Sequence, residues 1–141
     1  MNIYFDMDGT IADLYGVENW LEDLLHEEVY PYTAAKPLVN MNSLARILNR
    51  LIRNGHTVNI ISWTSRNGSE SYNNAVKKAK IKWLETHLRS VHFTSIIIIP
   101  YGTPKELYGE GILFDDEENN RIAWGSNAYS ETEIFQILRT L

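Results

Sequence analysis

Two aspartates stand two positions apart near the start of the chain, directly after a short apolar run. Asp6 and Asp8 follow Ile3–Phe5 and precede Gly9 and Thr10. In a strand, residues i and i+2 point to the same side. Two carboxylates held that close repel each other unless a cation or a proton lies between them. The pair therefore indicates a site that binds a cation or moves a proton.

A second acidic cluster ends another apolar run in the same manner. The run Gly111–Phe114 is followed by four acids, Asp115 to Glu118. A lone acidic pair or a run of acids is usually solvated surface, but the shared position after an apolar run favours function. The chain has no cysteine, and none of its four histidines has zinc-ligand spacing. Hard oxygen ligands therefore favour Mg²⁺ as the cation.

Four short apolar runs have the composition of β-strands. Most are continuously apolar rather than alternating, which is typical of strands buried on both faces of a parallel sheet. Helical patterns lie between them, and this alternation predicts an α/β fold with helices on both sides of the sheet. The runs are Ile3–Phe5, Val58–Ile61, Ile96–Ile99 and Ile112–Phe114.

Three segments have the periodicity of helices. In the first, Asn42 is the expected N-cap and Gly55 the stop, with apolar residues at helical spacing between them. The second is expected from about residue 72 to residue 88, and the third after the capping-box pair Ser130 and Glu133. In the second helix, Lys77, Lys78, Lys80 and Lys82 are expected to be mostly solvated, whereas Ala75, Ala79, Trp83 and Leu84 are expected to face the sheet.

Residues 13–41 fit the strand–helix alternation least well. The segment is rich in acids and aromatics, and Trp20, Leu21, Leu24 and Leu25 suggest one short amphipathic helix ended by Pro31 and Pro37. We expect a single domain over residues 1–141, with 13–41 as a small helical cap insert. Parallel sheets of this type bind ligands at the carboxyl ends of their strands. The residues at those ends are Asp6–Thr10, Ser62–Arg66, Pro100–Lys105 and Asp115–Glu118.

The motifs at these ends resemble those of the haloacid dehalogenase (HAD) superfamily of phosphohydrolases. The sequence IYFDMDGT at residues 3–10 resembles the first HAD motif, hhhDxDGT. Ser62, seven residues after Gly55, resembles the second motif, Lys105 the third, and the pair Asp115 and Asp116 the fourth. The motifs come in the family's order over residues 3–116. The resemblance implies a three-layer Rossmann-like fold with a mainly parallel sheet.

Two further stretches point to one branch of this superfamily. ILFDD at residues 112–116 and WLETHL at residues 83–88 resemble the 5'(3')-deoxyribonucleotidases and small uncharacterised bacterial and phage relatives. The resemblance implies a phosphomonoester hydrolase whose substrate is a nucleoside monophosphate or another small phosphorylated metabolite. The physiological substrate and the oligomeric state stay open.

The resemblance also implies a two-step phosphoryl transfer. Asp6 would be the nucleophile that becomes an aspartyl-phosphate, and Asp8 the general acid and then the general base. Asp6, the backbone carbonyl of Asp8, and Asp115 would hold Mg²⁺. Asp116 would orient a metal-bound water, or it would exchange roles with Asp115.

The same resemblance assigns the residues that bind phosphate. Ser62 would donate a hydrogen bond to a phosphate oxygen, assisted by the backbone N–H of Trp63, and Lys105 would neutralise its charge. Thr64 is the alternative second-motif residue, because TSR also resembles the TAR of many relatives. Thr10 would help to hold the loop that closes the site, or would act as a structural cap. Arg66, also at this edge, would contact substrate or be exposed.

Composition narrows the partners. The chain of 141 residues has a net charge of −5 and no basic stripe, which makes nucleic acid an unlikely partner. It shows no signal-peptide pattern and no apolar run long enough to span a bilayer, so we expect a soluble, cytoplasmic protein without membrane contact.

Three other functions compete with the phosphatase. The first is a HAD-fold phosphate-binding or regulatory domain with weak or no activity, which the presence of Asp8 disfavours. The second is a receiver-type signalling domain, whose phosphorylated aspartate follows a later strand. The third is a nucleic-acid end-processing phosphatase. Fold alone does not choose among these functions.

Overall fold

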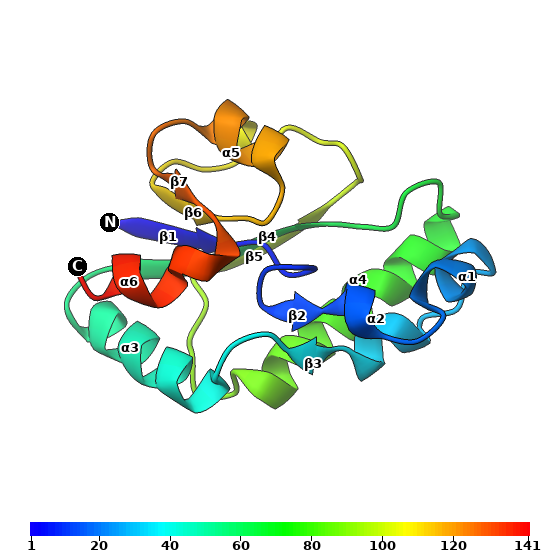
Figure 1. Cartoon of the computed structure of the whole chain (residues 1–141), viewed down its shortest axis with the longest axis horizontal. Coiled ribbons are helices and arrows are strands. Elements are labelled where there is room, and N and C mark those ends of the chain that lie inside the picture. The colour runs from blue at the N-terminus through cyan, green and yellow to red at the C-terminus, as the bar shows by residue number, and fades with distance from the viewer.

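A five-stranded parallel sheet forms the centre of the computed structural model, which describes residues 1–141 (Figure 1). All four neighbouring strand pairs are parallel. The four predicted strands are confirmed, and a fifth strand of two residues was too short to predict. In sheet order the strands are β5 (Ser95–Ile99), β4 (Thr57–Trp63), β1 (Asn2–Phe5), β6 (Ile112–Phe114) and β7 (Ala128–Tyr129).

Helices cover the two faces of this sheet unequally. The larger apolar cluster joins one face to α3 (Met41–Arg53), α4 (Glu70–His87) and α6 (Ile134–Leu138). On the other face a smaller cluster around Tyr4 and Leu113 packs against Trp124 of α5 (Glu118–Trp124). Figure 1 shows α5 on one side of the sheet and α3 and α6 on the other. The predicted three-layer α/β fold is therefore confirmed.

Two details of the predicted helices were wrong. The N-cap of α3 is Asn40 rather than Asn42: its side-chain oxygen accepts a hydrogen bond from the Ser43 N–H at 3.0 Å. Asn40 is the last residue with extended backbone, so its side chain can reach the free N–H groups of the first turn. In α4, Ala75 is exposed and Val76 takes the buried place predicted for it.

Lys80 was also placed wrongly, because it is buried rather than solvated. The other three lysines of α4 are exposed or half-buried, as predicted. Ala79, Trp83 and Leu84 face the core, also as predicted. Lys80 lies within this same apolar stripe, so a helical projection places it on the covered face.

The insert begins and ends in a two-stranded ribbon. β2 (Ala12–Asp13) pairs antiparallel with β3 (Lys36–Pro37). Between them lie a 3₁₀ turn (Leu14–Gly16), α1 (Trp20–Leu25) and α2 (Tyr30–Ala34). The prediction that Pro31 ends a helix was wrong. Pro31 lies in the first turn of α2, where the missing N–H costs no hydrogen bond.

The insert is fixed to α4 by packing and by hydrogen bonds. Tyr32 and Leu14 lie in a small apolar cluster with Tyr72 and Val76 of α4. The Tyr72 hydroxyl donates to a backbone carbonyl of the insert, that of Glu28, at 2.8 Å. In Figure 1 the insert forms one side of the molecule together with α4. The cap-like segment is therefore held against α4.

The remaining elements are short. A 3₁₀ turn (Lys105–Leu107) precedes β6, and another (Glu131–Glu133) precedes α6. The predicted capping box of Ser130 and Glu133 is confirmed. None of the helices combines the length and the apolar composition that crossing a membrane requires.

Candidate active site

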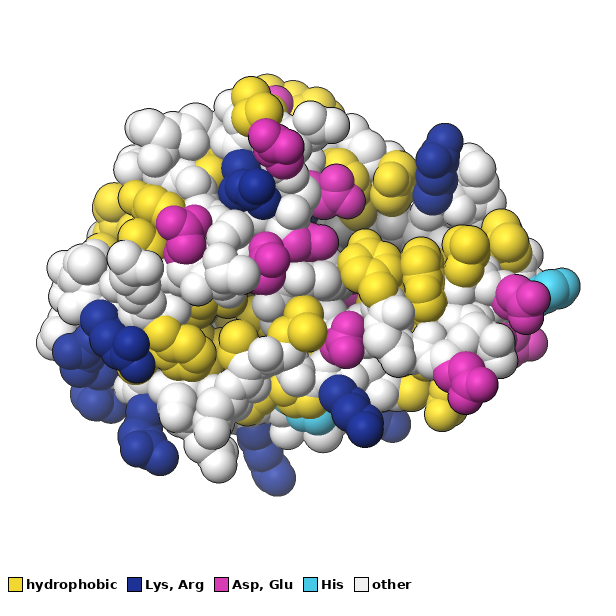
Figure 2. Space-filling model, viewed as in Figure 1, with side chains coloured by type: hydrophobic (Ala, Val, Ile, Leu, Met, Phe, Trp, Pro, Cys, Tyr) yellow, Lys and Arg dark blue, Asp and Glu magenta, His cyan; other side chains and the backbone are white.

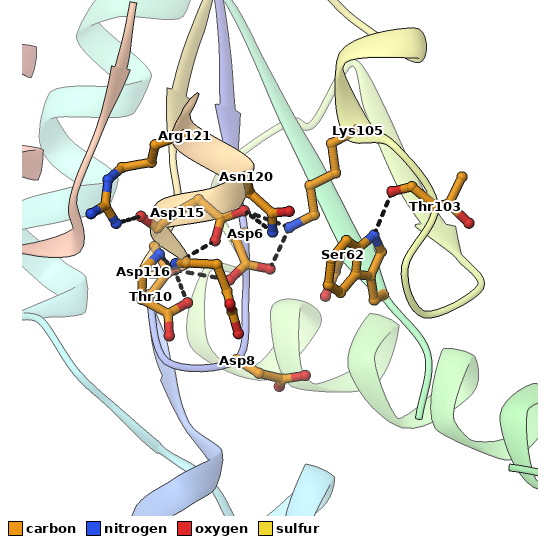
Figure 3. Close-up of polar contacts among 12 residues, drawn as sticks. Asp6, Asp8, Thr10, Ser62, Thr103, Lys105, Asp115, Asp116, Asn120 and Arg121 are labelled. Atoms are coloured by element: carbon orange, nitrogen blue, oxygen red, sulfur yellow. Dashed lines mark hydrogen bonds and ion pairs between the residues drawn. The ribbon is translucent and has the colours of Figure 1, made fainter. Parts of the chain in front are cut away.

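Asp6 and Asp115 meet a buried lysine at the carboxyl ends of two adjacent strands. The Lys105 Nζ lies 3.0 Å from Asp6 Oδ1 and 2.7 Å from Asp115 Oδ2. Parallel pairing of β1 with β6 places the two aspartates side by side, and the Asp6 N–H donates to the Phe114 carbonyl at 2.9 Å. Figure 3 shows the Lys105 ammonium reaching between the two carboxylates.

Thr10 connects Asp6 to Asp116. Its hydroxyl lies 3.0 Å from Asp6 Oδ2 and 3.2 Å from Asp116 Oδ1, and it accepts a hydrogen bond from the Asp116 N–H at 3.1 Å. The side chain of Thr10 is fully buried. Thr10 therefore fixes the loop after β1 against the loop after β6.

Position 9 requires a glycine because of its backbone conformation and because a Cβ has no room there. Its φ is +80°, a region that residues with a Cβ rarely adopt. A Cβ on Gly9 would collide with the Asp116 carboxylate and would lie 2.9 Å from the Tyr15 ring. The DxDGT sequence therefore includes a glycine that lets Asp116 approach Asp6.

Asp115 is almost completely engaged by protein donors. Its Oδ1 accepts the Glu117 N–H at 2.9 Å, and its Oδ2 accepts Asn120 Nδ2 at 3.1 Å in addition to Lys105. The Arg121 guanidinium donates to the Asp115 backbone carbonyl at 2.9 Å. Asp115 is 0% exposed, whereas Asp116 is half-buried. The first helical turn of α5 thus orients Asp115.

The three carboxylates hold more negative charge than their surroundings balance. One oxygen of each of Asp6, Asp115 and Asp116 lies within 4.8 Å of the others, and one ammonium, that of Lys105, pairs with Asp6 and Asp115. Burial, and then the Asp6 charge, raises the pKa of Asp115 to about 6 and that of Asp116 to about 8. Burial alone would lower the pKa of Lys105, but Asp6 and Asp115 raise it.

These residues fit a hard divalent cation. The cluster has three carboxylates and one paired ammonium, and the donor atoms that it offers are all oxygens. This donor set suits Mg²⁺ better than a softer metal. The carboxylate of Asp116 has more lone pairs free for a ligand than that of Asp115. Asp115 already accepts hydrogen bonds from Lys105, Asn120 and the Glu117 N–H.

Asp8 lies apart from this cluster and pairs with Lys80. The Lys80 Nζ is 2.7 Å from Asp8 Oδ2. Burial raises the pKa of Asp8, and Lys80 opposes that rise. Lys80 is the residue at this site that the sequence patterns missed. Its position on the apolar stripe of α4, between Val76 and Trp83, was the signal that could have identified it.

The two candidate second-motif residues occupy different environments. Ser62 is fully buried, and its hydroxyl accepts a hydrogen bond from Lys80 at 2.8 Å. Thr64, two residues further on, lines the cavity. The Trp63 side chain also lines the cavity, and its indole N–H donates to the Thr103 carbonyl at 2.9 Å. The geometry therefore favours Thr64 over Ser62 as a ligand contact.

A cavity of about 480 Å³ opens above these residues. Asp6, Asp8 and Lys105 lie at its base. The insert supplies an apolar and aromatic wall, and Figure 2 shows hydrophobic side chains gathered over the α1 side of this hollow. The insert residues of this wall are Leu14, Tyr15, Trp20, Leu21, Leu24, Leu25 and Tyr32.

A second group of lining residues lies at the carboxyl ends of β4 and β5. The Trp63 and Tyr101 rings are 4.9 Å apart between centroids, and the Arg66 guanidinium lies 5.9 Å from the Tyr101 centroid. Arg66 and Lys105 are the cations of the lining, and four acids accompany them. The cavity is therefore largely apolar and aromatic, its lining has more acids than cations, and Lys105 is the cation at its base.

Comparisons with known proteins bear on the fold. No family model matches the chain, and no curated protein matches it. Chains of solved structures do match, among them one in the structure of a Pnkp1/Rnl/Hen1 complex, with a TM-score of 0.56 and 19% identity. The match covers 92% of this chain but 44% of the other, so this chain spans less than half the length of its neighbour. At this identity the likeness supports the α/β architecture alone.

Proposed function

We propose that this chain is a Mg²⁺-dependent phosphomonoester hydrolase of the HAD type, with Asp6 as the nucleophile. The observation that carries the proposal is the position of Asp6. Its carboxylate lies at the base of an open cavity and shares Lys105 with Asp115. It also lies beside Asp116, an acid that has no cation partner. A carboxylate so placed can meet a phosphoryl group, because the adjacent cations offset the like charges.

The reaction would proceed in two displacements. An Asp6 oxygen bonds to phosphorus while the ester P–O bond breaks, and Asp8 gives its proton to the departing alcohol. A water molecule then attacks phosphorus, Asp8 takes a proton from it, and the bond between phosphorus and Asp6 breaks. The products are the alcohol and inorganic phosphate. Both acids line the cavity, so both can reach one substrate.

The proposed cofactor is Mg²⁺, held by Asp6, Asp116 and the Asp8 backbone carbonyl. When bound, it would supply charge neutralisation for the transferring phosphoryl group. We assign the direct contact to Asp116 rather than to Asp115, because Asp115 already accepts three protein hydrogen bonds. Asp115 would then hold Lys105 beside Asp6.

Lys105 and Thr64 are the proposed phosphate contacts. Lys105 is 2% exposed and faces the cavity with its charge directed at Asp6. Thr64 lines the cavity, which supports it in the role first predicted for Ser62. Trp63 would contribute its side chain to the cavity wall, and Thr10 would hold Asp6 and Asp116 in register.

The proposed substrate is a small phosphomonoester with an apolar or aromatic organic part, including nucleoside monophosphates. The wall contributed by the insert would contact that part, and the acids around the mouth disfavour polyanions. Nucleic-acid ends are a weaker candidate for the same reason. A non-hydrolytic phosphate-binding domain would not need an acid such as Asp8 beside the nucleophile.

The test is steady release of phosphate under multiple turnover. Purified protein would be incubated with Mg²⁺ and a panel of phosphomonoesters, including nucleoside 5'- and 3'-monophosphates, sugar phosphates and oligonucleotides with a terminal phosphate. The proposal predicts many turnovers per molecule on at least one small monoester. Stoichiometric binding of phosphate without turnover on any of them would instead identify a binding domain.

A further inference from the structure

Lys80 is a buried cation that none of the roles above uses. Its side chain is 1% exposed, although it comes from the middle of α4. Its Nζ lies 2.7 Å from Asp8 Oδ2, 2.8 Å from Ser62 Oγ and 2.6 Å from the Trp63 carbonyl oxygen. An ammonium has three donors, so each has one acceptor here. The Tyr32 ring lies on another side, with its centroid 5.3 Å from Nζ.

This arrangement determines the direction of the Asp8 side chain. Asp8 makes a hydrogen bond through Oδ2 to Lys80, and its Oδ1 has no protein donor. The carboxylate is 18% exposed and lines the cavity. In Figure 3 the Asp8 carboxylate points away from the Asp6 and Asp116 carboxylates. Lys80 therefore holds Asp8 outside the group of acids that fits a cation.

We propose that Lys80 is the positioning residue for Asp8. Its ammonium anchors Oδ2 so that Oδ1 faces the cavity, where the leaving oxygen and then the attacking water would lie. The inference rests on the proposed function, because it gives Lys80 a part in the acid–base steps of that reaction. Without this anchor, the carboxylate is free to turn toward the cation site, and proton transfer loses its alignment.

A purely structural role for Lys80 makes a different prediction. Two of its three acceptors belong to β4, so the lysine also ties α4 to the end of that strand. Loss of a tether would lower stability and would slow every substrate to the same degree. Loss of a positioning residue would slow those steps that need a proton delivered to the leaving group.

The experiment compares two phosphate esters that differ in whether the leaving group needs a proton. The phenolate of 4-nitrophenyl phosphate departs without a proton, whereas the alkoxide of ribose 5-phosphate requires one. For Lys80→Met we expect kcat/KM to fall about 10²-fold on the alkyl ester, within the usual range for general acid catalysis, and less than about tenfold on the aryl ester. Lys80→Arg, which keeps the charge, should restore part of the alkyl activity. Lys78→Met, on the exposed side of the same helix, is the matched control and should leave both unchanged.

A second comparison asks whether Lys80 acts through Asp8. In an Asp8→Asn background, adding Lys80→Met should cause no further loss of kcat/KM on the alkyl ester. This double variant removes both charges of the buried pair, so it remains informative if Lys80→Met alone fails to fold. Equal losses on the two esters, or a further loss in the Asp8→Asn background, would overturn the positioning role while leaving the phosphatase proposal intact. An inactive wild-type protein on every ester with Mg²⁺ would overturn both.

Discussion

The base of the cavity and the wall beside it are built in opposite ways. At the base, Asp6, Asp115 and Lys105 are each less than 10% exposed and bind one another through short hydrogen bonds. In the wall, Leu21 is 54% exposed and Leu25 74% exposed, and their hydrocarbon side chains offer contact area only. The side chains at the base are therefore held in one geometry by their hydrogen-bond partners. The wall instead offers apolar surface to a ligand.

This difference teaches where precision is needed. Proton and phosphoryl transfer depend on alignment within a fraction of an ångström, so the groups that perform them are fixed by their own hydrogen-bond partners. Contact with an apolar ligand depends mainly on buried area, which tolerates loose side chains. Changes at the base should therefore alter rate steeply, and changes in the wall should alter affinity gradually.

The largest effect should come from the proposed nucleophile. Asp6→Asn should reduce kcat by about 10⁴-fold or more, because loss of one member of a catalytic unit disables the unit. The fold should persist, since Lys105 keeps its contact with Asp115. Phosphate release and a thermal melt on the same preparation would measure both effects. Asp23→Asn in α1, outside the cavity, is the matched control. Wild-type activity in a clean Asp6→Asn sample would contradict the assignment.

Removal of the metal should have the next largest effect. EDTA should abolish phosphate release, and added Mg²⁺ should restore it and raise the melting temperature, because a ligand that binds only the folded state stabilises it. In Asp116→Asn the melting-temperature rise at a given Mg²⁺ concentration should become smaller. Full activity in excess chelator would mean that the three acids do not serve a cation.

Gly9→Ala separates backbone strain from contact with the site. Gly9 and Gly55 both have positive φ, +80° and +96°, but a Cβ on Gly55 would meet nothing within 4 Å. Gly9→Ala and the control Gly55→Ala should each lower stability by about 1–2 kcal/mol through this strain. Only Gly9→Ala should also lose activity, because its Cβ displaces the Asp116 carboxylate. Denaturation and phosphate release measure the two losses separately, and equal activity in both variants would exclude the steric account.

The wall should give a modest and selective effect. Trp20 lines the cavity and contacts the Tyr15 ring at a centroid distance of 4.9 Å. Trp20→Ala should raise KM several-fold, about 1 kcal/mol of lost apolar contact, for a nucleoside monophosphate and leave ribose 5-phosphate unaffected. Leu107→Ala, an exposed apolar position outside the cavity, is the control. Equal effects of Trp20→Ala on both substrates would show that the wall does not contact the organic part.

The smallest effect should come from removing the hydrogen bonds by which Glu27 attaches the insert to Ser69. Glu27 accepts hydrogen bonds from the Ser69 hydroxyl and N–H at 2.7 and 2.8 Å, and these bonds lower the pKa of Glu27. A lowered folded-state pKa means that the stabilisation is present above the unfolded pKa, about 4.3, and is lost as pH falls through the folded value. Glu27→Ala should lower the melting temperature slightly at pH 7, and the difference from wild type should narrow as the pH falls below 4 or so. A difference that stayed constant with pH would rule out the carboxylate as its source.

The sequence by itself determined the strands of the sheet and the acids at their ends. Continuous apolar runs are a local signal for strands buried on both faces, and parallel connection places their carboxyl ends on one edge. The positions of Asp6, Asp8 and Asp115 followed from that rule together with the DxDGT pattern. The capping box at Ser130 was predictable for the same reason, because it depends on residues three apart.

Tertiary structure decided the contacts that join distant segments. Lys80 and Asp8 are 72 residues apart, and one lysine among four in α4 gains a buried partner only when the insert and β4 enclose it. The choice between Ser62 and Thr64 depended on the same enclosure, since Lys80 occupies the Ser62 hydroxyl and leaves Thr64 at the cavity. The apolar wall likewise required α1 to lie beside the strand ends. A charge is stabilised by the groups around it in space, and sequence periodicity describes only its neighbours along one helix or strand.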